Sequence, residues 1–330
     1  VQQGGAGTAP APARAATPAP EDEARASGAG ATSPAADASA TGEAAGTAVV
    51  VTFAGDIAAG TAGTPQYVNA MSTGDLIRRI DPAYALTGGD NAYQSATATE
   101  IRTKYEPTWG SFRAKTRPVP GNHEYKSAGA QPYYDYFFGG TQRRYYAFSP
   151  GAGWRFYMLN CEIDCGRGST QENWLRRDLA AHPGMHFAAV LHRPRFSSGA
   201  HGSSLLPASL WTVLERAGGD IVLSGHDHHY ERFAKQDASG RAFARGLRQF
   251  VVGTGGARLY DIRSARANSE KRLGADFGVL KLTLAPGRYS WAYVASGRCE
   301  MADDVSYDCP DRGNSVLDSG AAATNNAARS

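Results

Sequence analysis

Side chains that bind metal ions occur in five short clusters along the sequence. The last cluster contains two histidines one residue apart, His226 and His228, directly after the mainly apolar run 220–224. The four earlier clusters follow similar apolar runs and contain, in order, Asp56, Asp90, Asn122 and His192. Carboxylate oxygens, amide oxygens and imidazole nitrogens are common metal ligands in proteins. Together the clusters supply enough ligands for two metal ions.

A pair of neighbouring cations needs an anionic ligand between them to offset their repulsion, and Asp90 is the candidate for this bridge. Asp56 adds a second carboxylate for one ion, and His228 supplies an imidazole to that same ion. The other ion is served by Asn122, His192 and His226. Because His226 and His228 are separated by one residue, they point the same way in an extended segment. Two ions about 3.5–4 Å apart clamp the attacking and leaving oxygens of an in-line displacement.

The spacing of apolar residues predicts the elements that must position these clusters. Strands are expected over 48–53, 83–87, 117–120, 145–148, 154–160, 186–191, 220–223, 250–252, 279–284 and 289–294. Helices are expected over 66–80, 97–115, 169–181 and 204–217. Each polar cluster follows the carboxyl end of a strand, which is the edge where open α/β sheets build their sites. We therefore expect the clusters to converge at such an edge.

Composition divides the chain into three parts. Of residues 1–47, 37 are Ala, Gly, Pro, Ser or Thr. This segment buries too little apolar surface to offset the entropy of ordering, so we expect a disordered linker. Residues 48–310 are expected to form one catalytic domain, near the upper size for a single core. The Gly-, Ala- and Asn-rich residues 311–330 are expected to form a flexible C-terminal tail.

The cysteines and the charge indicate in which compartment the protein acts and which classes of partner it binds. Four cysteines allow three pairings, and the short spacings favour Cys161–Cys165 with Cys299–Cys309 over four free thiols. The even count and the Ala/Pro-rich leader favour a secreted or extracellular protein. No apolar run reaches the roughly 18 residues that span a bilayer. The formal net charge of +3 comes from scattered Lys and Arg, which predicts no nucleic-acid track.

Five sequence blocks, taken in order, resemble the motifs of the calcineurin-like metallophosphoesterases, and among them the purple acid phosphatases. The blocks are Asp56-Ile57-Ala58, Gly89-Asp90-Asn91-Ala92-Tyr93, Gly121-Asn122-His123-Glu124, Ala189-Val190-Leu191-His192 and Gly225-His226-Asp227-His228. Ala58 and Ala189 stand where the family pattern has Gly and Val. The resemblance implies an α/β fold of the α+β type, a four-layer αββα sandwich with two β-sheets between helices.

The resemblance also implies two ligand sets that share Asp90. One set would bind Fe(III) and consists of Asp56, Asp90, Tyr93 and His228. The other would bind a divalent iron, zinc or manganese ion and consists of Asp90, Asn122, His192 and His226. Most relatives carry a His two residues after the first Asp, where this chain has Ala58. In purple acid phosphatases a tyrosinate, here Tyr93, supplies the missing ligand and a visible colour, and such a hard anionic oxygen suits Fe(III).

Two further histidines acquire catalytic roles from the resemblance. His123 lies inside the Gly-Asn-His-Glu block, at a family position that contacts the phosphate and assists proton transfer. His201 lies nine residues after His192, a spacing that resembles the histidine near the leaving group. Either ring could protonate a departing alkoxide, and an imidazolium would also stabilise charge on the phosphoryl oxygens.

The implied reaction is hydrolysis of a small phosphorylated substrate by in-line attack of a metal-activated hydroxide. A phosphomonoesterase, similar to an acid phosphatase, is the first expectation. A phosphodiesterase on the same site is the alternative within the class, because two metal ions serve either reaction. A non-catalytic secreted binding protein that retains the fold is the alternative outside it. The complete set of seven metal ligands argues against a binding protein.

Overall fold

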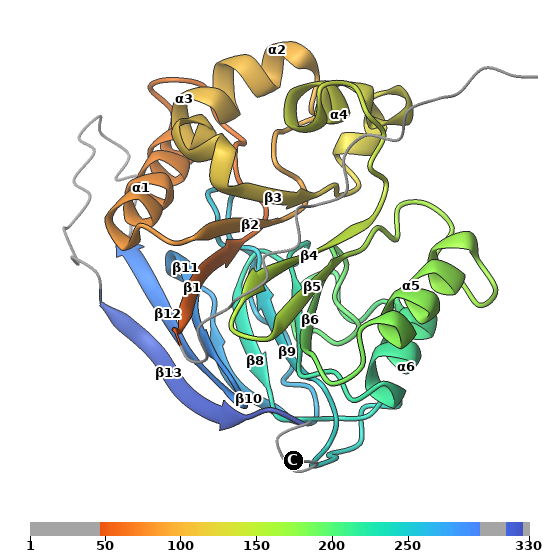
Figure 1. Ribbon diagram of the computed structural model, residues 1–330. Helices are drawn as coiled ribbons and strands as arrows, with labels where there is room; N and C mark the ends of the chain where they lie inside the picture. Colours follow the sequence, from red (N-terminus) through yellow and green to blue (C-terminus); the bar gives the residue numbers. More distant parts are fainter. Residues whose placement is uncertain (1–46, 298–314, 326–330) are drawn as a thin grey trace, which may run out of the picture. The chain divides into compact units, whose positions relative to one another are not determined.

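Two β-sheets packed face to face between helices form the domain (Figure 1). The computed structural model describes residues 47–297 and 315–325, all of them in one compact unit. The first sheet has the strand order β13-β12-β11-β1-β2-β3. Its strands are β1 (Val49–Ala54), β2 (Tyr84–Gly88), β3 (Thr116–Val119), β11 (Phe277–Ala285), β12 (Arg288–Gly297) and β13 (Val316–Ala323). Strands β1, β2 and β3 run parallel, so their carboxyl ends lie at one edge.

The second sheet has the order β10-β8-β9-β7-β6-β5-β4. Its strands are β4 (Tyr146–Gly151), β5 (Trp154–Met158), β6 (His186–Val190), β7 (Ile221–Ser224), β8 (Tyr230–Phe233), β9 (Arg248–Val252) and β10 (Ser269–Leu273). Strands β5, β6, β7 and β9 are parallel to their neighbours in this central part. The two sheets with their flanking helices confirm the expected α/β sandwich.

The helices cover the outer faces of the two sheets (Figure 1). They are α1 (Pro65–Ile80), α2 (Ala98–Glu100), α3 (Glu106–Trp109), α4 (Gln131–Phe138), α5 (Thr170–Ala181) and α6 (Ala208–Arg216). Helix α1 matches the expected helix closely, because the side chain of Thr64 caps it and Pro65 occupies its first turn. It packs against β11 and β12 of the first sheet.

The helix expected over 97–115 is found as a continuous helical segment over 98–115, but this segment changes its helical form several times. Between α2 and α3 lies a π-helical turn, η1 (Ile101–Tyr105), and a 3₁₀ turn, η2 (Gly110–Lys115), follows α3. Pro107 has no N–H to donate and its ring crowds the preceding turn, which is a known cause of such irregularity. Two further 3₁₀ turns, η3 (Glu124–Lys126) and η4 (Ala128–Ala130), precede α4.

The core lies between the sheets, with a second apolar layer beneath α5 and α6. Ile221 and Leu223 of β7 belong to the cluster between the sheets, which also contains Phe53 of β1. Val222, which points to the opposite face of the same strand, packs with Leu175 of α5 in the second cluster. Both faces of β7 are therefore buried, which explains why its sequence is a continuous apolar run.

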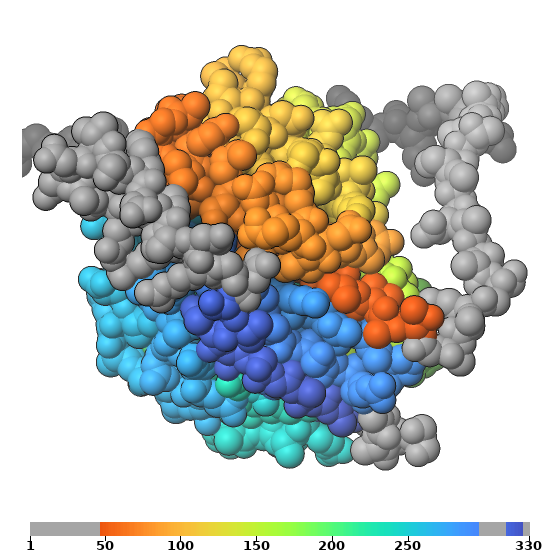
Figure 2. Space-filling view, turned by 90° about the vertical axis from the view of Figure 1, so that its left-hand side faces the viewer, coloured from red at the N-terminus to blue at the C-terminus, as the bar shows by residue number. Residues whose placement is uncertain are grey.

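The flexible tail expected from residue 311 is wrong for the last strand. Val316–Ala323 forms β13, which pairs antiparallel with β12 and lies at the surface in Figure 2. Asp318 of this strand accepts hydrogen bonds from the hydroxyl of Tyr230 and from Nε of Arg232, both at 2.7 Å. These cross-sheet contacts join residues that are far apart in the sequence. The strand consists mainly of small residues, so its own sequence does not predict them. The segment is held by its partners and not by its own apolar content.

The described residues bear on only some of the expectations for the disulfides, the linker and membrane spans. Cys161 and Cys165 form a disulfide, as expected. The pair Cys299–Cys309 and residues 1–46 of the expected linker lie outside the described residues. None of the helices in the part of the chain that the structure describes is long and apolar enough to cross a bilayer.

Candidate metal centre

The expected ligands lie together where the carboxyl ends of the parallel strands of both sheets meet. Asp56 follows β1, Asp90 and Tyr93 follow β2, and Asn122 follows β3, while His192 follows β6 and the pair His226 and His228 lies between β7 and β8. The sheets are joined directly here. The backbone N–H of His226, after β7 of the second sheet, donates to Oδ2 of Asp56, after β1 of the first, at 2.8 Å. Within the second sheet, Gly225 N–H donates to the carbonyl of His192 at 3.0 Å.

Three of these ligands sit in left-handed backbone turns. The φ angles are 60° at Asp56, 50° at Asp90 and 69° at His226. Such conformations cost of order 1 kcal/mol each for residues other than glycine, and they concentrate at functional sites. A Cβ atom on Gly121 would collide with Oδ1 of Asp90. The turns and the glycine allow the ligand-bearing loops to approach one another closely.

The first ligand group surrounds the phenol oxygen of Tyr93. That oxygen lies 2.9 Å from Oδ1 of Asp56, 3.2 Å from Oδ2 of Asp90 and 3.1 Å from Nε2 of His228. Nε2 of His228 also lies 3.2 Å from Oδ1 of Asp56. All four side chains are buried and come from three different loops. They form the first set that the sequence analysis proposed.

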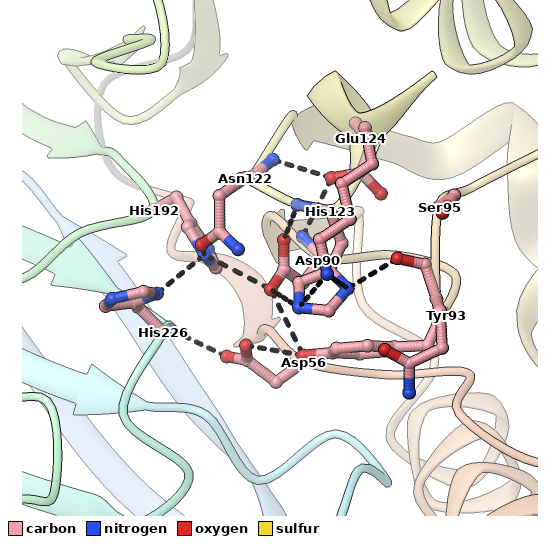
Figure 3. Close-up of polar contacts among 12 residues, drawn as sticks. Asp56, Asp90, Tyr93, Ser95, Asn122, His123, Glu124, His192 and His226 are labelled. Carbon is pink, nitrogen blue, oxygen red and sulfur yellow. Dashed lines mark hydrogen bonds and ion pairs between the residues drawn. The ribbon is translucent and has the colours of Figure 1, made fainter.

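The second ligand group surrounds Nε2 of His192 (Figure 3). This nitrogen lies 3.0 Å from Oδ1 of Asn122, 3.1 Å from Nδ1 of His226 and 3.4 Å from Oδ2 of Asp90. The ligand atoms of Asp90, His192 and His226 all lie within 4.8 Å of one another. The same carboxylate oxygen, Oδ2 of Asp90, therefore stands between both groups, as a bridging ligand must.

The hydrogen-bonding pattern indicates that cations fit between these atoms. Nδ1 of His192 lies 2.8 Å from the carbonyl of Gly88, and Nδ1 of His228 lies 2.6 Å from the carbonyl of Arg258. A carbonyl only accepts, so each Nδ1 carries a proton, and the lone pair at Nε2 is free to bind a metal ion once the second ring proton has left. Ligands about 2.1 Å from one ion lie about 3 Å apart when they occupy adjacent positions. The observed spacings match that value.

Electrostatics in the site also favours positive charge. Burial would lower the pKa of His192, but the charge and hydrogen bond of Asp90 outweigh it and raise that pKa to about 10. Burial and the carboxylates of Asp56 and Asp90 raise the pKa of Tyr93 well above its ordinary value. The phenol of Tyr93 can ionise only when a cation stands beside it. For His226, burial and the charges of His192 and Arg193 lower the pKa to about 2, which keeps its ring neutral and able to bind a metal.

Glu124 organises the loops of the site, a role that the sequence analysis missed. Its Oε2 accepts hydrogen bonds from the backbone N–H of Asp90 at 2.9 Å and of Gly121 at 2.6 Å, and its Oε1 accepts from Asn91 at 2.7 Å. The side chain is fully buried, and burial together with the charge of Asp90 raises its pKa. The position of Glu124 inside the Gly-Asn-His-Glu block is the sequence signal that could have indicated this role.

The two expected catalytic histidines lie at the rim of the ligand cluster. The backbone N–H of His123 donates to Oδ1 of Asp90 at 2.8 Å, and its ring lies 4.3 Å from that of Tyr93 between centroids. The ring of His201 stacks on that of His226 at 4.4 Å, with the planes inclined by 25°. His201 is exposed, so its ring is open to a substrate. The structure thus brings all nine predicted residues together.

Two further side chains flank the metal ligands without having been predicted. Arg193 places Nη1 3.1 Å from Nε2 of His226, while Glu162 holds the other side of the same guanidinium at 2.7 and 3.1 Å. Glu162 lies inside the loop closed by the Cys161–Cys165 disulfide. The ring of Tyr260 stacks on His228 at 4.1 Å, with the planes inclined by 7°. Arg193 directly follows a predicted ligand, whereas no sequence signal marks Tyr260.

A cavity of about 440 Å³ opens beside the first ligand group. Its walls include the ligands Tyr93 and His228 together with His123. Lys104 and Arg258 add positive charge, and no carboxylate lines the cavity. Lys104 pairs with Glu100 at 3.2 Å, whereas Arg258 has no ion-pair partner among the described residues. The cavity is suited to a small anionic ligand.

Sequence comparison gives one family. The sequence profile of the calcineurin-like phosphoesterases matches residues 49–230, which is more than half of the chain and includes every predicted metal ligand. No curated protein sequence matches the chain at a significant level.

Structural comparison gives several similar folds at low sequence identity. The purple acid phosphatase PPD1 from yellow lupin (Lupinus luteus) seeds has a TM-score of 0.65 and 19% identity, covering 84% of this chain and 54% of the lupin chain. GAP50, described as the anchor in the inner membrane complex of Plasmodium, has a TM-score of 0.63 and 16% identity, covering 84% and 89%. PhoD has a TM-score of 0.58 and 12% identity, covering 84% and 70%. This chain spans about half the length of the lupin protein, and identities this low establish a shared fold only.

Proposed function

The chain belongs to the calcineurin-like phosphoesterase family, and from this premise we propose that it is a dinuclear-metal phosphomonoesterase acting on small phosphorylated substrates. One observation supports the proposal above all. Oδ2 of Asp90 lies 3.2 Å from the phenol oxygen of Tyr93 and 3.4 Å from Nε2 of His192, so one carboxylate reaches both ligand groups. A scattered set of surface residues would have no such shared atom.

We assign the metal ligands as two sets. Asp56, Asp90, Tyr93 and His228 hold one ion, and Asp90, Asn122, His192 and His226 hold the other. A pair of such ions supplies charge neutralisation for the phosphoryl oxygens and a nucleophile at neutral pH. The phenol oxygen of Tyr93 favours Fe(III) in the first set, because hard anionic oxygen suits a hard trivalent ion. The imidazoles of the second set suit divalent zinc, iron or manganese.

The residues at the rim orient the substrate and move protons. His123 is fixed by the hydrogen bond from its backbone to Asp90, which keeps its ring beside the ligand cluster, where it can bind a phosphoryl oxygen. His201 is exposed and stacked on His226, so it can donate a proton to the leaving-group oxygen as the P–O bond breaks. In this proposal His123 binds the phosphate and His201 donates the proton.

The charge of the cavity wall favours a monoester over a diester. A monoester dianion carries one more negative charge than a diester, and Lys104 and Arg258 line the cavity without any carboxylate. Lys104 shares its charge with Glu100, so the cation that attracts the dianion more strongly is mainly Arg258. The phosphodiesterase remains the alternative within the same site.

A binding protein that keeps the fold is the second candidate, and one observation favours it. The similar structure of GAP50 is described as an anchor, so a fold of this kind can serve attachment. The complete ligand set of this chain argues for catalysis, because attachment alone requires no bridging carboxylate.

The test compares hydrolysis of p-nitrophenyl phosphate with that of its bis ester by protein loaded with iron and with zinc or manganese. We expect the monoester to be turned over with the larger kcat/KM, and the Asp90→Ala variant to be inactive on both. A preference for the bis ester would support the phosphodiesterase. Absence of turnover of either ester, with two ions bound per chain, would support the binding protein.

Two features support our proposal of a secreted or extracellular location. Cys161 and Cys165 form a disulfide, which persists in oxidising compartments, and the leader is rich in Ala and Pro. We expect cell fractionation to find the protein outside the cytoplasm with this disulfide intact. Recovery of the protein in the cytoplasm with both thiols free would contradict this location.

A further inference from the structure

The segment that carries His226 and His228 has a second, buried face. The backbone of this segment bends at His226, where φ is 69°, and the neighbouring residues Asp227, His229 and Glu231 are all 0% exposed. These three side chains contact residues 197–202, the loop that carries His201. We call residues 197–202 the acid loop. One side of the segment thus faces the metal ligands, and the other side binds the acid loop.

Asp227 makes the central contacts to the acid loop. Its Oδ1 accepts a hydrogen bond from the backbone N–H of His201 at 2.8 Å, and its Oδ2 accepts from the backbone N–H of Gly202 at 3.1 Å. The hydroxyl of Ser197 donates to Oδ2 as well and itself accepts from Gly199 N–H at 3.0 Å. A Cβ atom on Gly199 would collide with the carboxylate of Asp227. Loop and carboxylate are therefore packed in direct contact.

Glu231 and His229 extend this contact along the loop. Glu231 accepts a hydrogen bond from the backbone N–H of Ser198 at 2.8 Å and another from the Ser198 hydroxyl. Nε2 of His229 lies 3.1 Å from the same carboxylate. From the outer side, the backbone N–H of Arg263 donates to the carbonyl of Ser198 at 3.0 Å. The acid loop is held on two sides.

The energetics of Asp227 point to a role beyond stability. A buried carboxylate is costly unless hydrogen bonds or an opposite charge compensate for its lost hydration. Among the residues that the structure describes, no Lys, Arg or His side chain forms an ion pair with Asp227. Its compensation comes from the three acid-loop donors. An apolar side chain would fill this space at lower cost but could not fix the backbone of His201.

We propose that Asp227 is a positioning residue that fixes the ring of His201 over His226 and thereby sets the efficiency of leaving-group protonation. The proposal rests on the phosphomonoesterase function. A proton donor has to be held within about 0.5 Å of its productive position. Because Asp227 lies between the predicted ligands His226 and His228 in the chain, the segment that carries these ligands also binds the backbone of the proton donor. His201 passes its proton to the leaving-group oxygen as the P–O bond breaks, and solvent returns a proton to the ring.

The test uses Asp227→Asn and two substrates that differ in their need for a proton. Asn keeps the size of the side chain but turns an N–H₂ group toward the acid-loop donors. We expect kcat for phenyl phosphate to fall roughly 10- to 100-fold. For p-nitrophenyl phosphate, whose leaving group departs without protonation, we expect a fall of less than about threefold. The metal content measured by elemental analysis is expected to match that of the wild type.

A double-variant cycle separates positioning from a general structural effect. In the His201→Ala background, the Asp227→Asn change is expected to leave the ratio of the two kcat values unaltered, because the proton donor is already absent. Asp237→Asn is the matched control, since Oδ1 of Asp237 accepts from the backbone of Ser239 at 2.8 Å and of Arg241 at 2.9 Å in a surface turn. This control is expected to leave kcat unchanged for both substrates.

Several outcomes would overturn the proposal. The first is an equal fall in kcat for both substrates. The others are a further change in the ratio of the two kcat values when Asp227→Asn is added to His201→Ala, and loss of metal from Asp227→Asn. If that variant does not fold, Ser197→Ala decides, because it removes one donor to Asp227 and is expected to shift the ratio in the same direction by a smaller factor. Absence of hydrolysis by the wild type would instead contradict the phosphomonoesterase function itself.

Discussion

Nε2 of His192 lies 3.0 Å from the amide oxygen of Asn122, although neither atom has a proton to share when the ring is neutral. The proton of the ring is at Nδ1, which donates to the carbonyl of Gly88 at 2.8 Å. Two acceptors at this distance repel each other unless a cation lies between them, either a second ring proton, which the pKa of about 10 supplies without metal, or a metal ion. The pair therefore marks a position for positive charge that a metal ion can take from this proton, and the predictions below follow from it and from its neighbours.

Asp90→Ala is expected to remove both metal ions, because Oδ2 of Asp90 approaches both ligand groups. Elemental analysis of the purified variant should find the metal content reduced from about two ions per chain to nearly none. Asp75→Ala is the control, because Asp75 is a half-exposed residue of α1 that pairs with Arg78 and belongs to neither ligand group. Retention of one full equivalent of metal by Asp90→Ala would show that the carboxylate does not bridge.

Tyr93→Phe is expected to abolish the visible absorption band of the iron-loaded protein. The phenol oxygen lies within 3.2 Å of three other ligand atoms, and the raised pKa of Tyr93 means that only a bound cation can ionise it. Tyr260→Phe is the control, because the ring of Tyr260 stacks on His228 and contributes no atom to the ligand group. A colourless wild-type protein with iron bound would contradict the assignment of Tyr93 as a ligand.

Glu124→Gln is expected to destabilise the metal-free protein by about 1–3 kcal/mol. Both carboxylate oxygens of Glu124 accept backbone N–H groups, and the amide nitrogen of Gln would leave buried donors without an acceptor. Chemical denaturation measures the difference in the free energy of unfolding. Asp75→Asn should change it by less than about 1 kcal/mol, since the side chains of Asp75 and its partner Arg78 are both partly exposed. Similar values for the two variants would refute the organising role of Glu124.

Asp220 is expected to make stability depend on pH in the acidic range. Burial raises its pKa to about 6, although the backbone N–H of Asn325 donates to Oδ1 at 2.6 Å. The unfolded value is about 3.9, so the folded state binds the proton more tightly. The stability contributed by this carboxyl is present below about pH 4 and is lost as the pH rises through about 6.

The variant Asp220→Asn isolates this effect. Between about pH 4 and pH 7 the free energy of unfolding of the wild type should fall by about 2 kcal/mol relative to the variant. Urea denaturation at a series of pH values measures the difference, in which the other titrating groups cancel. A difference that is constant across this range would show that Asp220 is ionised in the folded protein throughout.

The sequence by itself determined the chemistry of the site and the strands that present it. The ligand types stand at the ends of short apolar runs, and parallel strands bring such ends to one edge irrespective of the details of packing. The strand β7 and the helix α1 could both be predicted from the spacing of their apolar residues, because this signal is local. The order of the blocks added the family, which matches residues 49–230.

Only the tertiary structure decided which side chains support the ligands. Strand β13 is held by cross-sheet contacts of Asp318, and Asp227 meets the backbone of His201 across 26 positions of the sequence. A lone Asp or Glu looks the same in a sequence whether it faces solvent or accepts three buried donors. Its role depends on which distant backbone groups the fold leaves without partners, and that is settled only when the sheets and loops pack together.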